Sequence, residues 1–321
     1  MTRWTVAICS SMLVVAMLMA IKMLFCVRPQ AFSPNAPVCV SPEVSVKAKE
    51  VVAERSASRG VVDAAATSAA VAVVCGGDAA TADRYEERSA ALRSVSRRRD
   101  LPSGDVAALT EFLRSTGDPM RDERVAALKN DVMNLLRRQS PPPEGLADTL
   151  VGMFCGGRHP AAVLDYCIQH LGAMQNDVGD SGLKSRIRSV FVEAAKQKKR
   201  AYSGTALYSL AATALPTPEQ EAELRRLTFS LCRPDANVAA RVAAIQLAGE
   251  RGYAEALPVL RETLSSPRRD AVLDIVCLGS VGLLGSSADL PLLERFARLD
   301  SRRALAANAA IRRIKERESV K

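Results

Sequence analysis

The side chains best suited to acid–base or nucleophilic chemistry lie together in Asp165-Tyr-Cys-Ile-Gln-His170. At helical spacing Asp165 and Gln169 share one face, and Tyr166 and His170 share another. Such a cluster could transfer a proton or bind a polar ligand. Cys167 has no histidine four residues away, so a thiol–imidazole pair within this helix is unsupported. We interpret the stretch as a helix whose polar side chains satisfy neighbouring backbone groups.

The remaining sequence carries no motif for catalysis or cofactor binding. There is no phosphate-binding loop, no dinucleotide-binding glycine pattern, no H-E-x-x-H and no G-x-S-x-G. Gly156-Gly-Arg-His159 follows no strand, so we interpret it as a loop between helices. We therefore predict a protein that is not an enzyme, with no catalytic, cofactor-binding or metal-binding residues, no cofactor and no small-molecule ligand.

The cysteines point to packing in the core. No pair forms C-x-x-C, and neither of the two histidines, His159 and His170, has a metal-ligand spacing to a cysteine. A free cysteine in an apolar helical pattern behaves as a small hydrophobic residue. This interpretation covers Cys155, Cys167, Cys232 and Cys277.

The net charge of +9 is spread thinly over the chain. The two basic runs, Arg97–Arg99 and Lys196–Arg200, fall where predicted helices end, and cations there complement the helix dipole. A nucleic-acid binder usually concentrates its charge on one face, which argues against that class. Binding of nucleic acid or anionic lipid through these helix ends is the alternative reading.

The N-terminus predicts a membrane anchor. Residues 4–21 contain no charge, Lys22 interrupts, and residues 23–27 are again apolar. A helix over residues 4–25 would be about 33 Å long, enough to cross a bilayer. A cleaved signal peptide lacks a convincing cleavage site, and a lipoprotein signal ending at Cys26 is disfavoured by the large Phe25. We expect residues 1–28 to be a single-pass anchor in the cell (inner) membrane, with the C-terminal domain outside the cytoplasm.

Residues 29–80 read as a disordered linker rich in Pro, Ala and Val. A second span over residues 61–74 is a weaker alternative. From about residue 81 the apolar pattern takes the helical period, and Ala and Leu rather than aromatics (4% of the chain) carry the apolar content. The predicted helices are about 82–98, 104–115, 120–138, 144–155, 160–173, 183–198, 203–213, 218–231, 236–251, 254–265, 269–284, 288–298 and 302–317.

An internal repeat appears near the C-terminus. Ala256-Leu-Pro-Val-Leu260 recurs as Asp289-Leu-Pro-Leu-Leu293, 33 residues later. The same offset relates the apolar positions Ala244, Cys277 and Ala310, and also Ile245, Leu278 and Ile311. Each unit is one helix, a short glycine-containing turn and a second helix with Pro in its first turns. Such units must stack to bury their apolar faces.

Asp235-Ala-Asn-Val-Ala-Ala-Arg-Val-Ala-Ala-Ile-Gln-Leu-Ala-Gly249, followed by Ala256-Leu-Pro-Val-Leu-Arg261, resembles a HEAT repeat of the short bacterial type also found in phycobilisome lyases. The resemblance covers about residues 202–317. It implies an all-α fold, an α-α superhelix of the ARM/HEAT type. We divide the helical part into residues 81–200, with possible degenerate repeats, and residues 201–321, with HEAT-like repeats.

The resemblance also implies a scaffold or adaptor that binds protein partners on the solenoid surface, while residues 4–27 contact the membrane. Residues near 257–264 and 290–297, in the second helices, would line its concave surface. The weakest alternative is an enzyme, either a lyase of the HEAT-like class or one that acts through His170.

Overall fold

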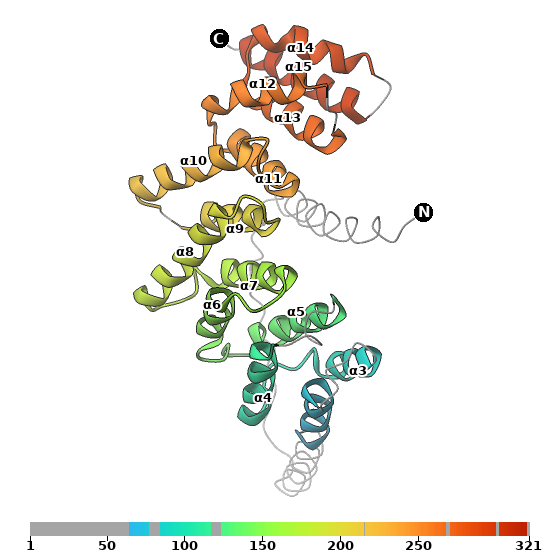
Figure 1. Ribbon diagram of the computed structural model, residues 1–321, viewed down its shortest axis with the longest axis vertical. Coiled ribbons are helices and arrows are strands. Elements are labelled where there is room, and N and C mark those ends of the chain that lie inside the picture. The colour runs from blue at the N-terminus through green and yellow to red at the C-terminus, as the bar shows by residue number, and fades with distance from the viewer. Residues whose placement is uncertain are drawn as a thin grey trace, which may run out of the picture. The chain divides into compact units, whose positions relative to one another are not determined.

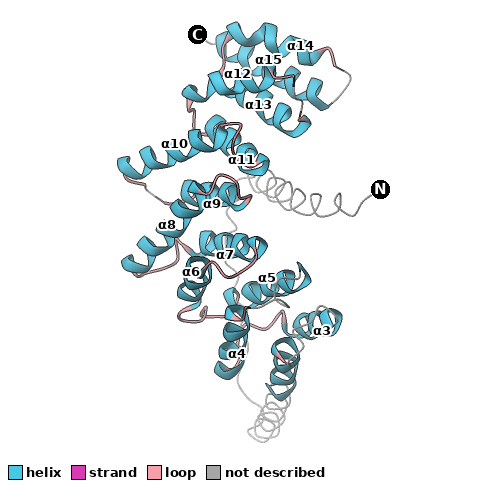
Figure 2. Ribbon diagram, viewed as in Figure 1, coloured by secondary structure: helices cyan, strands magenta, loops and turns pink. Residues whose placement is uncertain are grey.

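We analysed a computed structural model that describes residues 64–76, 84–116, 123–214, 216–267, 270–299 and 302–319. These residues all belong to one compact unit, Ala57–Lys321. Their regular structure is entirely helical, and none of them forms a strand (Figure 2). No helix in these ranges combines the length and apolarity needed to span a bilayer. The predicted anchor, residues 1–28, and residues 29–63 of the predicted linker lie outside the described residues.

The predicted helices are confirmed, with ends shifted by a few residues. Residues 64–75 are also helical. The labelled helices are α3 (Tyr85–Val95), α4 (Ser103–Arg114), α5 (Glu123–Arg137), α6 (Leu146–Gly156), α7 (Ala161–Met174), α8 (Ser181–Lys196), α9 (Tyr202–Ala211), α10 (Pro218–Cys232), α11 (Val238–Glu250), α12 (Leu257–Ser265), α13 (Ala271–Leu284), α14 (Leu290–Ala297) and α15 (Arg302–Ser319), with single 3-10 turns at Ala254–Ala256 and Ser287–Asp289.

Local sequence signals account for many helix ends. Thr217 and Gln220 form a capping box at the start of α10. The Asp270 side chain accepts hydrogen bonds from the first free backbone N–H groups of α13. Proline occupies the first turn of α12 and α14, where a missing N–H costs nothing. Gly252 ends the α11 turn at a φ of 72°, a left-handed conformation that favours glycine.

The helices pack in two interleaved series. Each odd-numbered helix from α3 to α15 contacts the next odd-numbered one, and α4, α6, α8 and α10 contact in turn on the other side. Consecutive helices such as α10 and α11, or α12 and α13, join the two series (Figure 1). The packing runs across residue 200 through α8 and α9 without a break. This order is compatible with an α-solenoid.

The 33-residue offset correctly relates buried positions. Ala244, Cys277 and Ala310 are buried, as are Ile245 and Leu278, while Ile311 on the last helix is half-buried. The same offset also relates Val238, the first residue of α11, to Ala271 and Ala304, but Val238 is exposed. Single exposed apolar side chains are common on folded surfaces, so apolar character alone does not signal burial.

Glycines set a close approach between neighbouring odd-numbered helices. A Cβ on Gly204 of α9 would lie 2.9 Å from Ala243 of α11, and a Cβ on Gly249 would lie 2.8 Å from Ser280 of α13. At these two contacts the neighbouring helices pack so closely that a side chain larger than glycine would not fit.

The prediction that residues 29–80 form a linker is wrong for residues 64–75. Thr67, Val71 and Val74 recur at i, i+4 and i+7 and are buried in the core. Arg88 of α3 donates from Nε and Nη2 to the Val74 carbonyl oxygen at 2.8 and 2.5 Å. The apolar stripe is built from small residues and looks weak in sequence, but the neighbouring helices complete its core.

Salt bridges connect successive even-numbered helices. Arg186 of α8 pairs with Asp148 of α6, and Arg188 of α8 pairs with Glu223 of α10 at 2.7 Å. The series continues with Arg225 of α10 to Glu255 beside α12, and with Arg261 of α12 to Asp289 beside α14. Only Asp289 is fully buried, and it binds both Nε and Nη2 of Arg261. These pairs fix the order of the stack more than they stabilise it.

Candidate functional site

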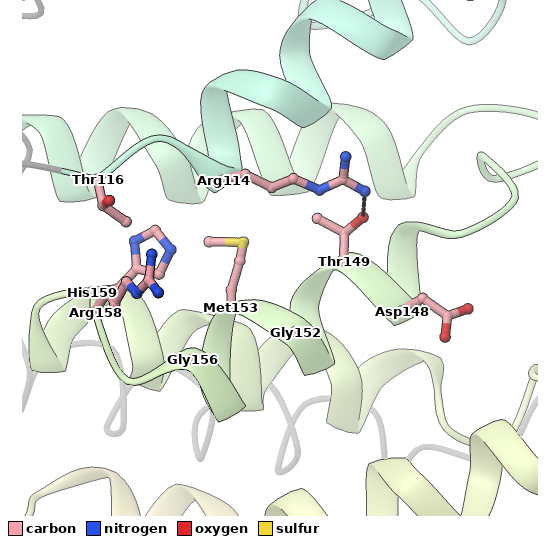
Figure 3. A pocket seen from close by; sticks show the side chains of 9 residues that line it. All are labelled: Arg114, Thr116, Asp148, Thr149, Gly152, Met153, Gly156, Arg158 and His159. Atoms are coloured by element: carbon pink, nitrogen blue, oxygen red, sulfur yellow. Dashed lines mark hydrogen bonds between the residues drawn. The ribbon is translucent and has the colours of Figure 1, made fainter.

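A pocket of about 450 Å³ lies between the C-terminal end of α4 and the length of α6. Arg114 and Thr149 lie at one end, Arg158, His159 and Thr116 lie at the other, and Met153 stands between them (Figure 3). The remaining lining residues are Asp148, Gly152 and Gly156, all on α6. We take this pocket as the candidate functional site.

The loop after α6 brings Arg158 and His159 to the pocket. Gly157 adopts a left-handed conformation with a φ of 61° and ends α6. Pro160 then starts α7, so the chain reverses within a few residues and the two side chains between the helices project together. The sequence correctly predicts a loop here, but gives no sign that the loop borders a pocket.

Arg114 is held by a side-chain hydrogen bond at the end of α4. Its Nη2 donates to Thr149 Oγ1 at 2.9 Å, and its Nη1 lies 3.8 Å from Glu111 one turn earlier. The Arg114 side chain is still 55% exposed. Thus the guanidinium is oriented along the pocket and remains accessible to a ligand.

Lys129 of α5 is a buried cation at this end of α4. Its Nζ donates to the carbonyl oxygens of Leu113 and Ser115 at 2.9 and 2.5 Å, and it lies 5.6 Å from the centre of the Phe112 ring. A cation at a helix C-terminus offsets the partial negative charge of the free carbonyls. Burial lowers the pKa of Lys129 to about 8.

His159 is a neutral side chain in the pocket wall. Burial, and then the positive charge of Lys129, lower the pKa of its imidazole to about 4. Its Nδ1 is buried and has no hydrogen-bond partner among the described residues. At neutral pH the ring can therefore donate or accept one hydrogen bond, but adds no charge of its own.

The cluster around His170 is placed mainly by side-chain contacts between helices. Gln169 donates to Asp165 at 3.2 Å, as the helical spacing predicts, whereas His170 Nε2 lies 3.1 Å from Asn130 Oδ1 of α5. The interpretation that these residues satisfy backbone groups is thus wrong, because side chains of neighbouring helices provide the contacts. Burial raises the pKa of Asp165 and lowers that of His170 to about 4. The cluster does not line the pocket between α4 and α6.

The predicted core positions of three cysteines are confirmed. Cys167, Cys232 and Cys277 are buried, and burial raises the pKa of each thiol to about 12. The prediction is wrong for Cys155, which is exposed on α6. Its side chain falls on the outward face of α6, which no described helix covers.

Both basic runs follow helix ends, as predicted. Arg97–Arg99 comes directly after α3, and Lys196 is the last residue of α8. The second run is largely occupied. Lys198 pairs with Asp235 at 3.7 Å, Lys199 donates to the Asp235 carbonyl oxygen, and Lys196 pairs with Glu193.

Within the described ranges, no group of three His, Cys, Asp or Glu side chains could hold a metal ion. No protein-family model matches the chain, and no curated protein matches it. The HEAT resemblance therefore stays a prediction, and the function is argued from the site and the fold.

Proposed function

We propose that the protein is a membrane-tethered scaffold of the HEAT-like α-solenoid type, which binds protein partners and carries out no catalysis of its own. The observation that carries the proposal is the continuous series of odd-numbered helices from α3 to α15, with α4, α6, α8 and α10 packed in turn beside it. Each odd-numbered helix packs on the next one, so the array presents successive helices along its surface. An array of this kind offers an extended surface for a protein partner.

The chemical groups in the pocket favour binding over catalysis. Arg114, Arg158 and two threonines can hold a ligand, but Cys167 lies buried in the core with a raised thiol pKa. His159 and His170 both have pKa values near 4, too low for an efficient general base at neutral pH. The second basic run, Lys196–Arg200, does not favour binding of nucleic acid or anionic lipid, because its lysines pair with groups of the protein itself.

The experiment is chemical cross-linking in intact cells, followed by capture of the full-length chain from solubilised membranes. A chain that stops before residue 64 keeps the predicted anchor and linker and is the matched control. We expect one or more proteins to be enriched with the full chain and absent from the control. Equal recovery with both chains would contradict a binding role for the helical domain.

The tether and its sidedness need a separate measurement. We expect the full chain to stay in the membrane pellet after alkaline carbonate washing. We also expect a C-terminal tag to be digested by protease added to intact spheroplasts. Protection of the tag until lysis would place the helical domain in the cytoplasm and direct the partner search there.

A further inference from the structure

The pocket between α4 and α6 carries excess positive charge. Arg114 and Arg158 line it, and Lys129 lies under the end of α4. Of the carboxylates nearby, Asp148 is paired with Arg186, and Glu111 lies 3.8 Å from Arg114. Arg158 is therefore left without a paired carboxylate, and Lys129 is matched by the α4 carbonyls rather than by an acid. A pocket with this balance attracts anionic groups.

Hydrogen-bonding capacity in the pocket is also left unused. Within the described part of the chain Arg158 makes no hydrogen bond or ion pair, and Arg114 uses one guanidinium nitrogen for Thr149. The His159 side chain is buried, with 9% of its surface exposed, and its Nδ1 atom has no hydrogen-bond partner among the described residues. A carboxylate accepts two parallel bonds from a guanidinium, so each arginine can hold one carboxylate.

The outward face of α6 lets another chain approach closely. Gly152 and Gly156 lie one turn apart beside the pocket, and a Cβ on either would meet no atom within 4 Å. Asp148 occupies the preceding turn of the same face. From Gly152 to Gly156, about one turn, this face therefore presents backbone rather than side chains, with Arg114 and Arg158 towards opposite ends of the pocket (Figure 3).

The openness of the pocket favours an extended ligand over a small one. Small-molecule sites bury roughly 70–90% of their ligand. Here Arg114 is more than half exposed and Arg158 is exposed, so a small anion would keep much of its surface in water. A peptide that crosses the glycine face can contact both arginines and bury further surface beyond them.

We propose that this pocket docks an extended acidic segment of a protein partner, with carboxylates paired to Arg114 and Arg158 and the backbone lying over Gly152 and Gly156. The inference rests on the proposed scaffold function and specifies the chemistry of its partner. It needs no covalent step and no cofactor.

The test uses the full-length chain in detergent and fluorescence anisotropy of a short labelled peptide of alternating Glu and Ser. We expect binding that weakens with added salt, and no binding of the Lys–Ser counterpart. Arg158→Glu, and the double variant Arg114→Glu/Arg158→Glu, should weaken binding by about tenfold or more. Gly152→Leu should also weaken it, since a side chain there blocks the backbone without changing any charge.

Matched controls separate docking from general effects. Arg226→Glu changes an exposed charge on α10, and Gly104→Leu fills open space at the opposite end of α4. Both should bind the acidic peptide as the wild type does. Unchanged circular dichroism and thermal unfolding will show that Arg158→Glu and Gly152→Leu are folded. Equal binding by the pocket variants and the controls would overturn the proposal.

A competition arm identifies the source of the anion. If free glutamate or inorganic phosphate at matched charge displaces the peptide completely, the pocket holds a small anion and the peptide proposal is wrong. Cross-linking in cells distinguishes failure of the scaffold function from failure of the docking site. Partners captured equally by wild type and Arg158→Glu would leave the scaffold function standing and reject this docking site. Peptide binding without any captured partner would support the docking site and reject the scaffold function.

Discussion

A Cβ atom placed on Gly282 would lie 2.8 Å from the Cα atom of Ala310, so α13 and α15 meet here through their backbones. Gly249 of α11, which lies 33 residues earlier, makes the equivalent close contact with Ser280 of α13. From α11 to α15, glycine on one helix of each pair thus allows the close approach of the next odd-numbered helix.

The first prediction concerns this contact. Gly282→Ala should lower the free energy of unfolding by about 1–3 kcal/mol, because the added methyl group must displace the α15 backbone. Gly279→Ala, in the same helix, is the control, since a Cβ there meets nothing within 4 Å. The control should be neutral, or stabilising by up to about 1 kcal/mol, because alanine favours the helix. Equal effects in urea unfolding would mean that the two helices can move apart freely.

A second prediction tests the buried repeat positions. Ile245 and Leu278 have no exposed surface, so Ile245→Ala and Leu278→Ala should each cost about 2–5 kcal/mol. Leu305→Ala is the comparison, because Leu305 is 73% exposed, and should cost less than about 0.5 kcal/mol. Denaturant unfolding measures all three. A loss below about 0.5 kcal/mol for Ile245→Ala or Leu278→Ala would show that the repeat register is wrong.

A third prediction concerns acid. His159 and His170 have pKa values near 4 in the folded chain, against 6.5 for the free group. The unfolded chain therefore binds protons first, and their contribution, complete above pH 6.5, is lost as the pH falls towards 4. The loss should be roughly 2–3 kcal/mol for each histidine.

Urea unfolding at pH 7 and pH 4.5 measures this effect. The double variant His159→Gln/His170→Gln should lose less stability over that interval than the wild type. The comparison between chains matters because the raised pKa of Asp165 acts in the opposite direction. Equal losses in both chains would indicate that the two imidazoles titrate normally in the fold.

A fourth prediction concerns alkaline pH. The pKa of Lys129 is lowered from 10.5 to about 8, so between these values the unfolded chain holds the extra proton. Stability from this group therefore rises with pH through that window, as the cost of burying the charge disappears. The wild type should gain stability relative to Lys129→Met between pH 8 and pH 9. Both chains contain the same cysteines, so ionisation of thiols in the unfolded chain cancels in this difference. A constant difference would place the Lys129 amine in a more hydrated setting.

The helices of this protein were largely predictable from sequence because their signals are local. The capping box at Thr217, the prolines in the first turns of α12 and α14, and the glycine after α11 act within a few residues of the helix ends. The repeat offset likewise placed Ile245 and Leu278 in equivalent buried sites. Val238 was the exception, because it is apolar but exposed.

Contacts between distant segments were not predictable. Residues 64–75 looked too weakly apolar to fold. Their contacts with distant residues, such as the Val74 carbonyl with Arg88 and the Ser68 hydroxyl with Asp105, show how they join the core. The same limit applies to Lys129, which has the charge of a surface residue but no exposed surface. Both cations are buried because each binds the carbonyls at the end of another helix, and sequence spacing does not encode which helix that is.

The candidate site shows most clearly which features the sequence predicts and which depend on the tertiary structure. Its residues come from the end of α4, the outward face of α6 and the loop before α7, and no spacing in the sequence relates Arg114 to Arg158. By itself the sequence determined the helices of the described residues from 84 onward, their ends to within a few residues, and the 33-residue offset of the buried positions near the C-terminus, because helical period and capping are short-range effects. Only the tertiary structure decided which charges face one another across the pocket, because that depends on how the helices stack.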